Sequence, residues 1–544
     1  MRKKIIGFMS AIMFGFAMQA QTLQEGLKYI DSEKYEASRD LFKALTTKEP
    51  KNGDNWFYLG QSYINLLQND SAKVCFETGI QQAPSNPTNY AGLGELELIA
   101  ENKDAAKVHF DKALSFGKSR AGIYTDIRAI AVVASSMASA PLKMLDEAEA
   151  LIKMGFEQDR KNYDLLIAGG DVYLEKNDGG NSATFYERAI AIDPKNPKAF
   201  VRVSSIWIRV KNYEQAQIDL NRAFEKDPNY AQAWKYQAEL YYAQRKFSLA
   251  KEAYGKYLGF SEPSIANQVR FVRILFLSKA YDEALEKIES ILAMDKDNLL
   301  LNRLRAFSVA EVIETKNNPE LAKSAIGSLN FYLNKVEPKK IIGADYEYLA
   351  KLQIKTGSDD SMAILNFKKA LEMSPNNIDV YTDMAKAYNK MRMFDSAALC
   401  YENYIAVSKK VTAADHFLHG KALYYAKQYA KADSAFMRVS VIKPDYPDSY
   451  LWRGNCLSGL DPDFKTDLPK VQYEKYIELL MVDPEKFETS LKVKNKAGLI
   501  NAYSYLGYYH LNKDKNAEAK EYYKKVVELD PNNAQAKKVL ADKK

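Results

Sequence analysis

Cysteine is scarce in this chain, which holds only three among 544 residues. Cys75, Cys400 and Cys456 are odd in number and far apart, and this pattern does not fit the disulfide framework of a small secreted domain. We therefore expect free and mostly buried thiols. Glycine is also infrequent, with 25 residues against 37 tyrosines, and the composition favours helices over sheets.

A large charge excess is missing as well. The formal net charge is +7, because 77 lysines and arginines nearly balance 70 aspartates and glutamates. The basic residues do not gather in clusters, so the sequence does not indicate a nucleic-acid partner.

Long apolar runs are absent except at the N-terminus. Residues 1–20 start with three basic residues, continue with an apolar run from Ile5 to about Ala17, and end in a small residue. This order is typical of a secretory signal peptide, although an uncleaved membrane anchor is the alternative. The run is shorter than the roughly 20 residues of a spanning helix. We expect residues 21–544 to be exported without a membrane span, and to be periplasmic or peripherally associated with the outer membrane.

The main feature of the chain is internal repetition. Residues 53–86 and 500–533 carry the same residue types at matching offsets. The matched positions are Trp56, Leu59, Gly60, Tyr63, Ala72, Phe76 and Pro84 in the first stretch, and Tyr503, Leu506, Gly507, His510, Ala519, Tyr523 and Pro531 in the second. Repeat starts fall near 19, 53, 87, 121, 163, 197, 231, 265, 299, 343, 378, 413, 447 and 500, which predicts fourteen repeats.

Each repeat reads as two antiparallel helices. Apolar residues recur three and four positions apart, pause at a short polar turn, and recur again. Small residues such as Gly60 and Ala238 stand where the two helices would cross, because close approach needs a short side chain. Proline after aspartate, as at Pro194, ends the second helix. One hairpin cannot bury its apolar face alone, so neighbouring repeats must stack.

These residues and this period resemble the tetratricopeptide repeat, from about residue 19 to the end. The resemblance implies an all-α, right-handed superhelical solenoid of about fourteen antiparallel helix pairs, with a concave groove lined by the first helix of each pair. The polar tail after Asn533 is expected to form a C-terminal capping helix. Residues 121–162, 299–342 and 447–499 depart from the pattern, and either hinges or binding loops would explain them.

Catalytic and metal-binding signals are weak. His416 and His419 are one helical turn apart and could share a metal ion, but they occupy packing positions, so a hydrogen-bonded core pair is the preferred interpretation. Asp461, Asp463 and Asp467 lie in an inserted loop that lacks the glycine and distal glutamate of a calcium loop. We predict no enzyme activity, no cofactor and no metal.

Groove positions follow from the resemblance, because the ninth residue of each first helix would face the concave side. These residues are acidic early in the chain and basic later, and a groove of this kind could fix the direction of an extended peptide. The predicted contact residues are Glu95, Asp171, Glu239, Tyr242, Lys351, Lys386, Asn389, Lys421, Tyr424 and Tyr508. The alternative is that the charges serve solubility and the tyrosines serve packing.

Lys386 and Asn389 come nearest to the arrangement with which some members of the family clamp a C-terminal carboxylate. The export signal and the usage of Tyr, Lys and Asn resemble envelope tetratricopeptide proteins of Bacteroidetes-type bacteria. This implies a non-catalytic scaffold or assembly factor of the bacterial cell envelope, which binds extended peptides or helices of other envelope proteins. A carbohydrate- or peptidoglycan-associated binder is the alternative and would need coplanar exposed aromatic rings. A hydrolase at His416 and His419 would need a third metal ligand.

Overall fold

The computed structural model describes residues 22–357 and 360–542. The predicted signal peptide, residues 1–20, lies outside the described residues. Over the described ranges, no helix combines the length and the apolar content that a bilayer-crossing segment needs.

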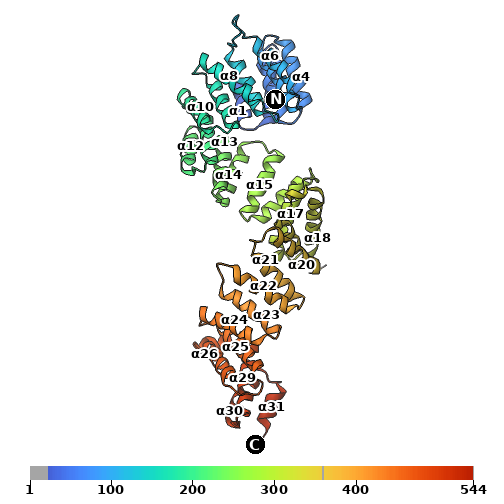
Figure 1. Ribbon diagram of the computed structural model, residues 1–544, viewed down its shortest axis with the longest axis vertical. Helices are drawn as coiled ribbons and strands as arrows, with labels where there is room; N and C mark the ends of the chain where they lie inside the picture. The colour runs from blue at the N-terminus through green and yellow to red at the C-terminus, as the bar shows by residue number, and fades with distance from the viewer. Residues whose placement is uncertain (1–21, 358–359, 543–544) are drawn as a thin grey trace, which may run out of the picture. The chain divides into compact units, whose positions relative to one another are not determined.

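Helices follow one another in pairs along the chain (Figure 1). The chain divides between Ile291 and Leu292 into two compact units, here called the N-terminal and the C-terminal unit. The pairs of the N-terminal unit are α1 (Leu23–Asp31) and α2 (Tyr35–Lys48), α3 (Gly53–Asn65) and α4 (Asn69–Gln82), α5 (Pro87–Ile99) and α6 (Lys103–Ser115), α7 (Ile127–Ser139) and α8 (Leu145–Gln158), α9 (Tyr163–Glu175) and α10 (Gly179–Ile192), α11 (Pro197–Arg209) and α12 (Tyr213–Lys226), α13 (Ala231–Ala243) and α14 (Phe247–Phe260), and α15 (Ile265–Leu277) and α16 (Tyr281–Leu292).

The C-terminal unit continues the series. Its pairs are α17 (Leu299–Lys316) and α18 (Pro319–Lys335), α19 (Gly343–Thr356) and α20 (Asp360–Met373), α21 (Asp379–Lys390) and α22 (Phe394–Val407), α23 (Ala413–Tyr425) and α24 (Tyr429–Ile442), α25 (Pro447–Leu460) and α26 (Leu468–Leu480), and α29 (Lys496–Leu511) and α30 (Asn516–Leu529), followed by the single helix α31 (Ala534–Ala541). The described chain therefore contains fourteen pairs and a terminal helix, which confirms the predicted architecture.

The three irregular regions differ from their neighbours in distinct ways. An eleven-residue stretch from Phe116 to Asp126 precedes α7, and a backbone bridge joins Lys118 to Tyr124 within it. Helices α17 and α18 have 18 and 17 residues, where most others have 13 or 14. Between α26 and α29 the chain forms α27 (Pro484–Lys486), a π-helical turn η2 (Phe487–Leu491) and α28 (Lys492–Lys494).

The turn inside a pair has a recurring backbone conformation. In α1–α2, Glu33 has a φ of 56°, and the N–H of Lys34 donates to the carbonyl of Tyr29, as in a helix end closed by a left-handed residue. Glu101 holds the same place in the α5–α6 turn, with a φ of 59°. Asparagine or glycine would suit this conformation better, so these glutamates stand at a slightly strained turn tip.

The two helices of a pair meet through a small residue and an aromatic ring. A side chain added at Gly94 of α5 would bring its Cβ within 2.5 Å of the ring of Phe110 in α6. The same contact, with the ring 16 residues after the glycine, recurs at Gly26 and Phe42, Gly60 and Phe76, Gly170 and Tyr186, Gly420 and Phe436, and Gly507 and Tyr523. The close helix crossing predicted from the small residues is thus present.

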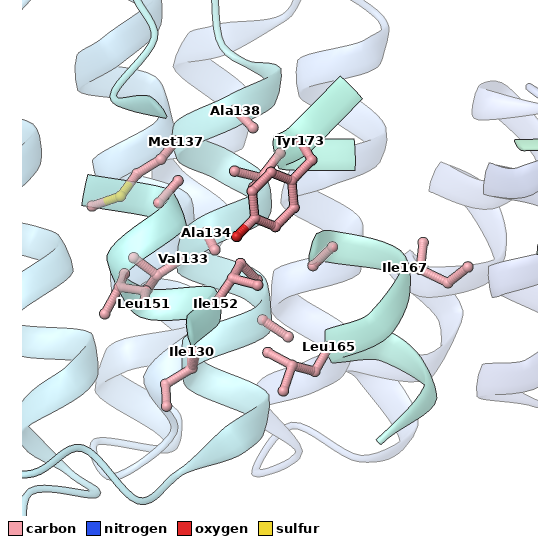
Figure 2. Packing of buried hydrophobic residues seen from close by; sticks show 14 of the residues in the cluster. Ile130, Val133, Ala134, Met137, Ala138, Leu151, Ile152, Leu165, Ile167 and Tyr173 are labelled. Atoms are coloured by element: carbon pink, nitrogen blue, oxygen red, sulfur yellow. The ribbon is translucent and has the colours of Figure 1, made fainter. Parts of the chain in front are cut away.

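Neighbouring pairs stack and share apolar cores. Figure 2 shows one such core, in which Ile130 and Val133 of α7, Ile152 of α8 and Leu165 of α9 belong to one cluster of buried side chains. All four side chains are fully buried. Three successive helices share one core here, so no single pair is an independent folding unit.

The ring contact at Gly94 predicts a stability cost. Gly94→Ala should lower the free energy of unfolding by about 1–3 kcal/mol, because the buried Phe110 ring must move. Gly255→Ala is the matched control: Gly255 lies inside α14 with nothing within 4 Å of an added Cβ, so alanine should stabilise by up to about 1 kcal/mol. Urea denaturation measures both. Equal destabilisation by the two variants would contradict this account of the helix crossing.

Candidate functional site

The acidic residues predicted for the groove are already paired in the N-terminal unit. Glu95 is buried in α5, where its carboxylate accepts hydrogen bonds from Gln61 Nε2 of α3 at 2.7 Å and Ser136 Oγ of α7 at 3.1 Å. Burial raises the pKa of Glu95. This carboxyl group ties three neighbouring first helices together, and little of it is left for a partner to contact.

Asp171 and Glu239 each pair with an arginine on the next first helix. Asp171 of α9 lies 3.3 Å from Arg202 of α11 and accepts a hydrogen bond from Tyr186 at 2.6 Å. Glu239 of α13 forms an ion pair with Arg270 of α15. In both cases the arginine stands 31 residues after the acid, a spacing that can be read in the sequence. The acidic charge of this face is therefore largely neutralised within the chain.

The predicted basic residues of the C-terminal unit are also partnered. Lys351 of α19 lies 2.5 Å from Glu347 and 3.4 Å from Asp383, and Lys386 of α21 lies 2.8 Å from the same Asp383. Burial opposes the charge of Lys351, but the two carboxylates raise its pKa. Asn389 stands half-buried on α21, one turn after Lys386. The predicted acidic residues and these predicted lysines are therefore paired within the chain, and their charges are not free to attract a partner.

Lys421 has a different neighbour. Its Nζ lies 5.5 Å from the ring centre of Trp452, so that α23 and α25 meet through a cation–π contact. The ring of Trp452 lies 5.1 Å from that of Tyr424 and stacks on Phe436 at 5.7 Å. Tyr425, which is 48% exposed, meets the same indole at 6.0 Å. The indole is therefore the centre of an aromatic cluster with a lysine on it.

An apolar pocket adjoins this cluster. Its lining residues come from the start of α23, the end of α24 and the segment before α25: Ala413, Ala414, Phe417, Leu418, Val439, Lys443 and Tyr446. Phe417 belongs to both features, because its ring lies 6.5 Å from Trp452 and 5.6 Å from Tyr446. Leu418 is 42% exposed although it is apolar. We call the pocket, together with Lys421, Tyr424, Tyr425 and Trp452, the α23–α25 surface.

This surface can hold an apolar side chain and an acidic one side by side. The pocket has aliphatic and aromatic walls. Lys443, which also lines the pocket, is exposed and supplies one cation. Lys421 supplies a second cation beside Trp452. Aromatic residues with a polar tip and exposed leucines are common at protein contact surfaces.

The aromatic rings do not form the flat platform that the carbohydrate hypothesis needs. The planes of Tyr424 and Tyr425 are 79° apart, and those of Tyr425 and Trp452 are 73° apart. Tyr508, which is 45% exposed on α29, stands at 64° to Phe464. Tyr242 packs edge-on against Phe247 in the N-terminal unit. None of these ring pairs is coplanar.

The two histidines of α23 lie beside the α23–α25 surface. Burial lowers the pKa of both His416 and His419, which are half-buried in α23. Within the described ranges, no group of three or more His, Cys, Asp or Glu side chains is placed to hold a metal ion.

The acidic loop after α25 uses its carboxylates to hold its own shape. Asp461 accepts hydrogen bonds from the backbone N–H of Lys465 at 2.8 Å and of Thr466 at 2.7 Å. Asp467 accepts a hydrogen bond from Tyr509 of α29.

Burial of the three cysteines raises the pKa of Cys75 and Cys400 to about 11 and that of Cys456 to about 12, so these thiols stay protonated.

A contact in the N-terminal unit joins residues about 200 positions apart. The carboxylate of Glu33, at the tip of the α1–α2 turn, accepts hydrogen bonds from Lys235 Nζ at 2.6 Å, Gln232 Nε2 at 3.0 Å and Asn267 Nδ2 at 3.1 Å, and another from the hydroxyl of Tyr257. Figure 1 shows α1 beside α13 accordingly. No local sequence signal indicates this contact, because its members belong to distant repeats.

Further bonds surround it. Asp31 accepts a hydrogen bond from the hydroxyl of Tyr230 at 2.6 Å and lies 3.2 Å from Lys198. In a second set of bonds the acceptor comes from the segment before α15: the carboxylate of Glu262 accepts hydrogen bonds from the backbone N–H groups of Glu36 at 2.7 Å and Ala37 at 3.0 Å in α2. We call the bonds of Asp31, Glu33 and Glu262 the closing contact.

The closing contact predicts a pH-dependent stability. Burial opposes ionisation of Glu33, but Lys235 and the hydrogen bonds outweigh it and lower its pKa from 4.5 to about 2. A carboxyl group with a lower pKa in the folded state stabilises the fold at pH values above its unfolded-state pKa. This stabilisation is lost as the pH falls from about 4.5 towards 2. Glu33→Gln should therefore cost up to about 3 kcal/mol near pH 7 and progressively less below pH 4.5.

Urea denaturation at pH 7 and at pH 3 measures this difference. Glu101→Gln, at the equivalent exposed turn tip of α5–α6, is the control and should change stability little at either pH. A cost of Glu33→Gln that does not depend on pH would contradict the assigned role of the ionised carboxylate.

Comparison with known proteins agrees with the helix pairs. Sequence models of the tetratricopeptide repeat match residues 209–264 and 500–533. No curated protein sequence is similar enough to this chain to count as a relative. Among solved structures, the C-terminal part of a TPR repeat-containing protein from Cytophaga hutchinsonii is 29% identical, with half of this chain and all of that chain covered and a TM-score of 0.42.

Two further solved structures are more distant. A chain of the APC/C hetero-tetramer Cut9–Hcn1 is 14% identical over 79% of this chain and 95% of its own, with a TM-score of 0.35. The P58(IPK) TPR domain is 16% identical over 75% of this chain and 97% of its own, with a TM-score of 0.30.

Proposed function

Because this chain is a tetratricopeptide-repeat protein, we propose that it binds a segment of a partner protein at the α23–α25 surface and has no catalytic role of its own. Tetratricopeptide repeats indicate a protein–protein interaction scaffold. The observation that carries the proposal is the continuity of an apolar pocket with a lysine–tryptophan patch through the shared ring of Phe417.

The preferred ligand follows from the chemistry of this surface. A leucine-sized or aromatic side chain would fill the pocket and cover Leu418, which removes apolar area from water. An acidic residue next to it would reach Lys421 or Lys443. Buried anchors of this kind supply most of the binding energy at protein interfaces, and the surrounding charges fix orientation.

The other predicted contact residues support the proposal less. Lys351 and Lys386 are held by Glu347 and Asp383, so a partner carboxylate would have to displace an existing ion pair. The steep angles between the rings of Tyr424, Tyr425 and Trp452 favour a peptide over a carbohydrate, because sugars stack on flat aromatic platforms.

A randomised peptide-display library selected on the full chain tests this function. Enriched peptides should share an apolar anchor close to an acidic residue. Titration calorimetry of one such peptide should show at least a tenfold loss of affinity for Leu418→Asp and a smaller loss for Lys421→Ala. Lys386→Ala is the matched control on α21 and should bind like the unmodified chain. Selected peptides that bind Leu418→Asp undiminished would place the site elsewhere.

The cellular setting is a separate part of the proposal. We infer a role as scaffold or assembly factor in the bacterial cell envelope from the order of basic, apolar and small residues in 1–20. Osmotic-shock fractionation of a bacterial host that expresses the full chain should recover it outside the cytoplasm, whereas a variant without residues 2–20 should stay inside. Cytoplasmic recovery of both would contradict the envelope role.

A further inference from the structure

The closing contact lies on a face formed by the first helices of successive pairs. Its donors Lys198, Gln232, Lys235 and Asn267 stand on three successive first helices, α11, α13 and α15. The groups that they hold are Asp31, the last residue of α1, and Glu33 in the turn between α1 and α2. Asp31 and Glu33 therefore cover part of the face that α11, α13 and α15 form in the N-terminal unit.

The carboxylate of Glu33 is bound as a ligand would be. Four side-chain donors from α13, α14 and α15 converge on its two oxygens, and the side chain is only 15% exposed. A carboxylate in such a setting needs these partners, because a buried charge without them is strongly unfavourable. The donor set thus selects an acidic group.

The contact is also reciprocal. Helix α2 begins without a side-chain cap of its own, and Glu262, from the segment before α15, accepts hydrogen bonds from its first N–H groups instead. A carboxylate at a helix N-terminus is favourable because it meets unpaired N–H groups and the positive end of the helix dipole. Acidic groups from both sides thus hold α1–α2 against α13–α15.

We propose that the α1–α2 turn is an intramolecular latch, which holds the first helix pair on the face of α11, α13 and α15 and so keeps the donors around Glu33 covered against an acidic segment of a partner. This binding face is distinct from the α23–α25 surface of the proposed function. The bonds identified in the latch are polar, so an external carboxylate can replace Glu33 by the same chemistry. Repeat arrays hold together through neighbour contacts, so the closing contact can open while α2 keeps the core that it shares with α3.

Pulsed electron paramagnetic resonance on the full chain tests the latch. Nitroxide labels on Lys43→Cys in α2 and Glu252→Cys in α14, both exposed positions, report whether the two helices stay together. The native thiols are buried and react slowly, and a sample without the introduced cysteines measures their labelling. Glu33→Gln should move the distance distribution to longer and broader values, and so should Glu262→Gln.

Glu101→Gln is the matched control, because it removes one carboxylate from the equivalent turn tip of α5–α6. Its distribution should overlay that of the unmodified chain. Circular dichroism confirms that each variant keeps its helices. If Glu33→Gln and Glu262→Gln both retain the original distribution, the closing contact does not hold the pair and the latch is overturned.

A hexaglutamate peptide tests whether the covered face accepts an acidic segment. By fluorescence anisotropy, Glu33→Gln should bind this probe at least ten times more tightly than the unmodified chain or Glu101→Gln. Adding Lys235→Ala to Glu33→Gln should abolish the gain. Equal binding by all the variants would overturn the claim that the turn covers a site for acidic segments, even if the labels showed that it opens.

Discussion

The close approach of two helices within each pair is the constraint on which the rest of this structure depends. A glycine or alanine on the first helix lets the ring of the second lie directly on its backbone, as at Gly60 and Phe76. This close approach lets each pair stack on the next and share an apolar core with it. Faces formed by successive first helices follow from it, including those that carry the α23–α25 surface and the closing contact.

Charge on those faces is used mostly within the chain. Asp171 and Glu239 are matched by arginines of the next repeat, and Lys351 and Lys386 by carboxylates of their own region. Such pairs contribute modestly to stability when exposed, but they fix the register between neighbouring helices. A surface that is apolar, aromatic and only lightly charged, such as that around Phe417 and Trp452, therefore offers a partner more than the paired positions do.

The repeat architecture could be read almost completely from the sequence, and the sites could not. Fourteen pairs and a final helix are local features, since each helix is specified by its own apolar spacing and each turn by its own residues. The neighbours of Lys421 are not local: Trp452 comes from the next repeat. The bonds of Glu33 are even harder to predict from the sequence. Its partners lie about 200 residues away along the chain, and they come close to Glu33 only through the way several repeats stack together.

Hydrogen exchange, measured by mass spectrometry on the full chain with and without a library-selected peptide, tests the central claim most directly. Bound peptide should slow exchange in α23, α24 and the start of α25, because the pocket and the lysine–tryptophan patch lie there. Exchange in α3–α6 should not change. Protection that appears in α3–α6 or in α17–α19, with none in α23–α25, would contradict the assignment of the binding site.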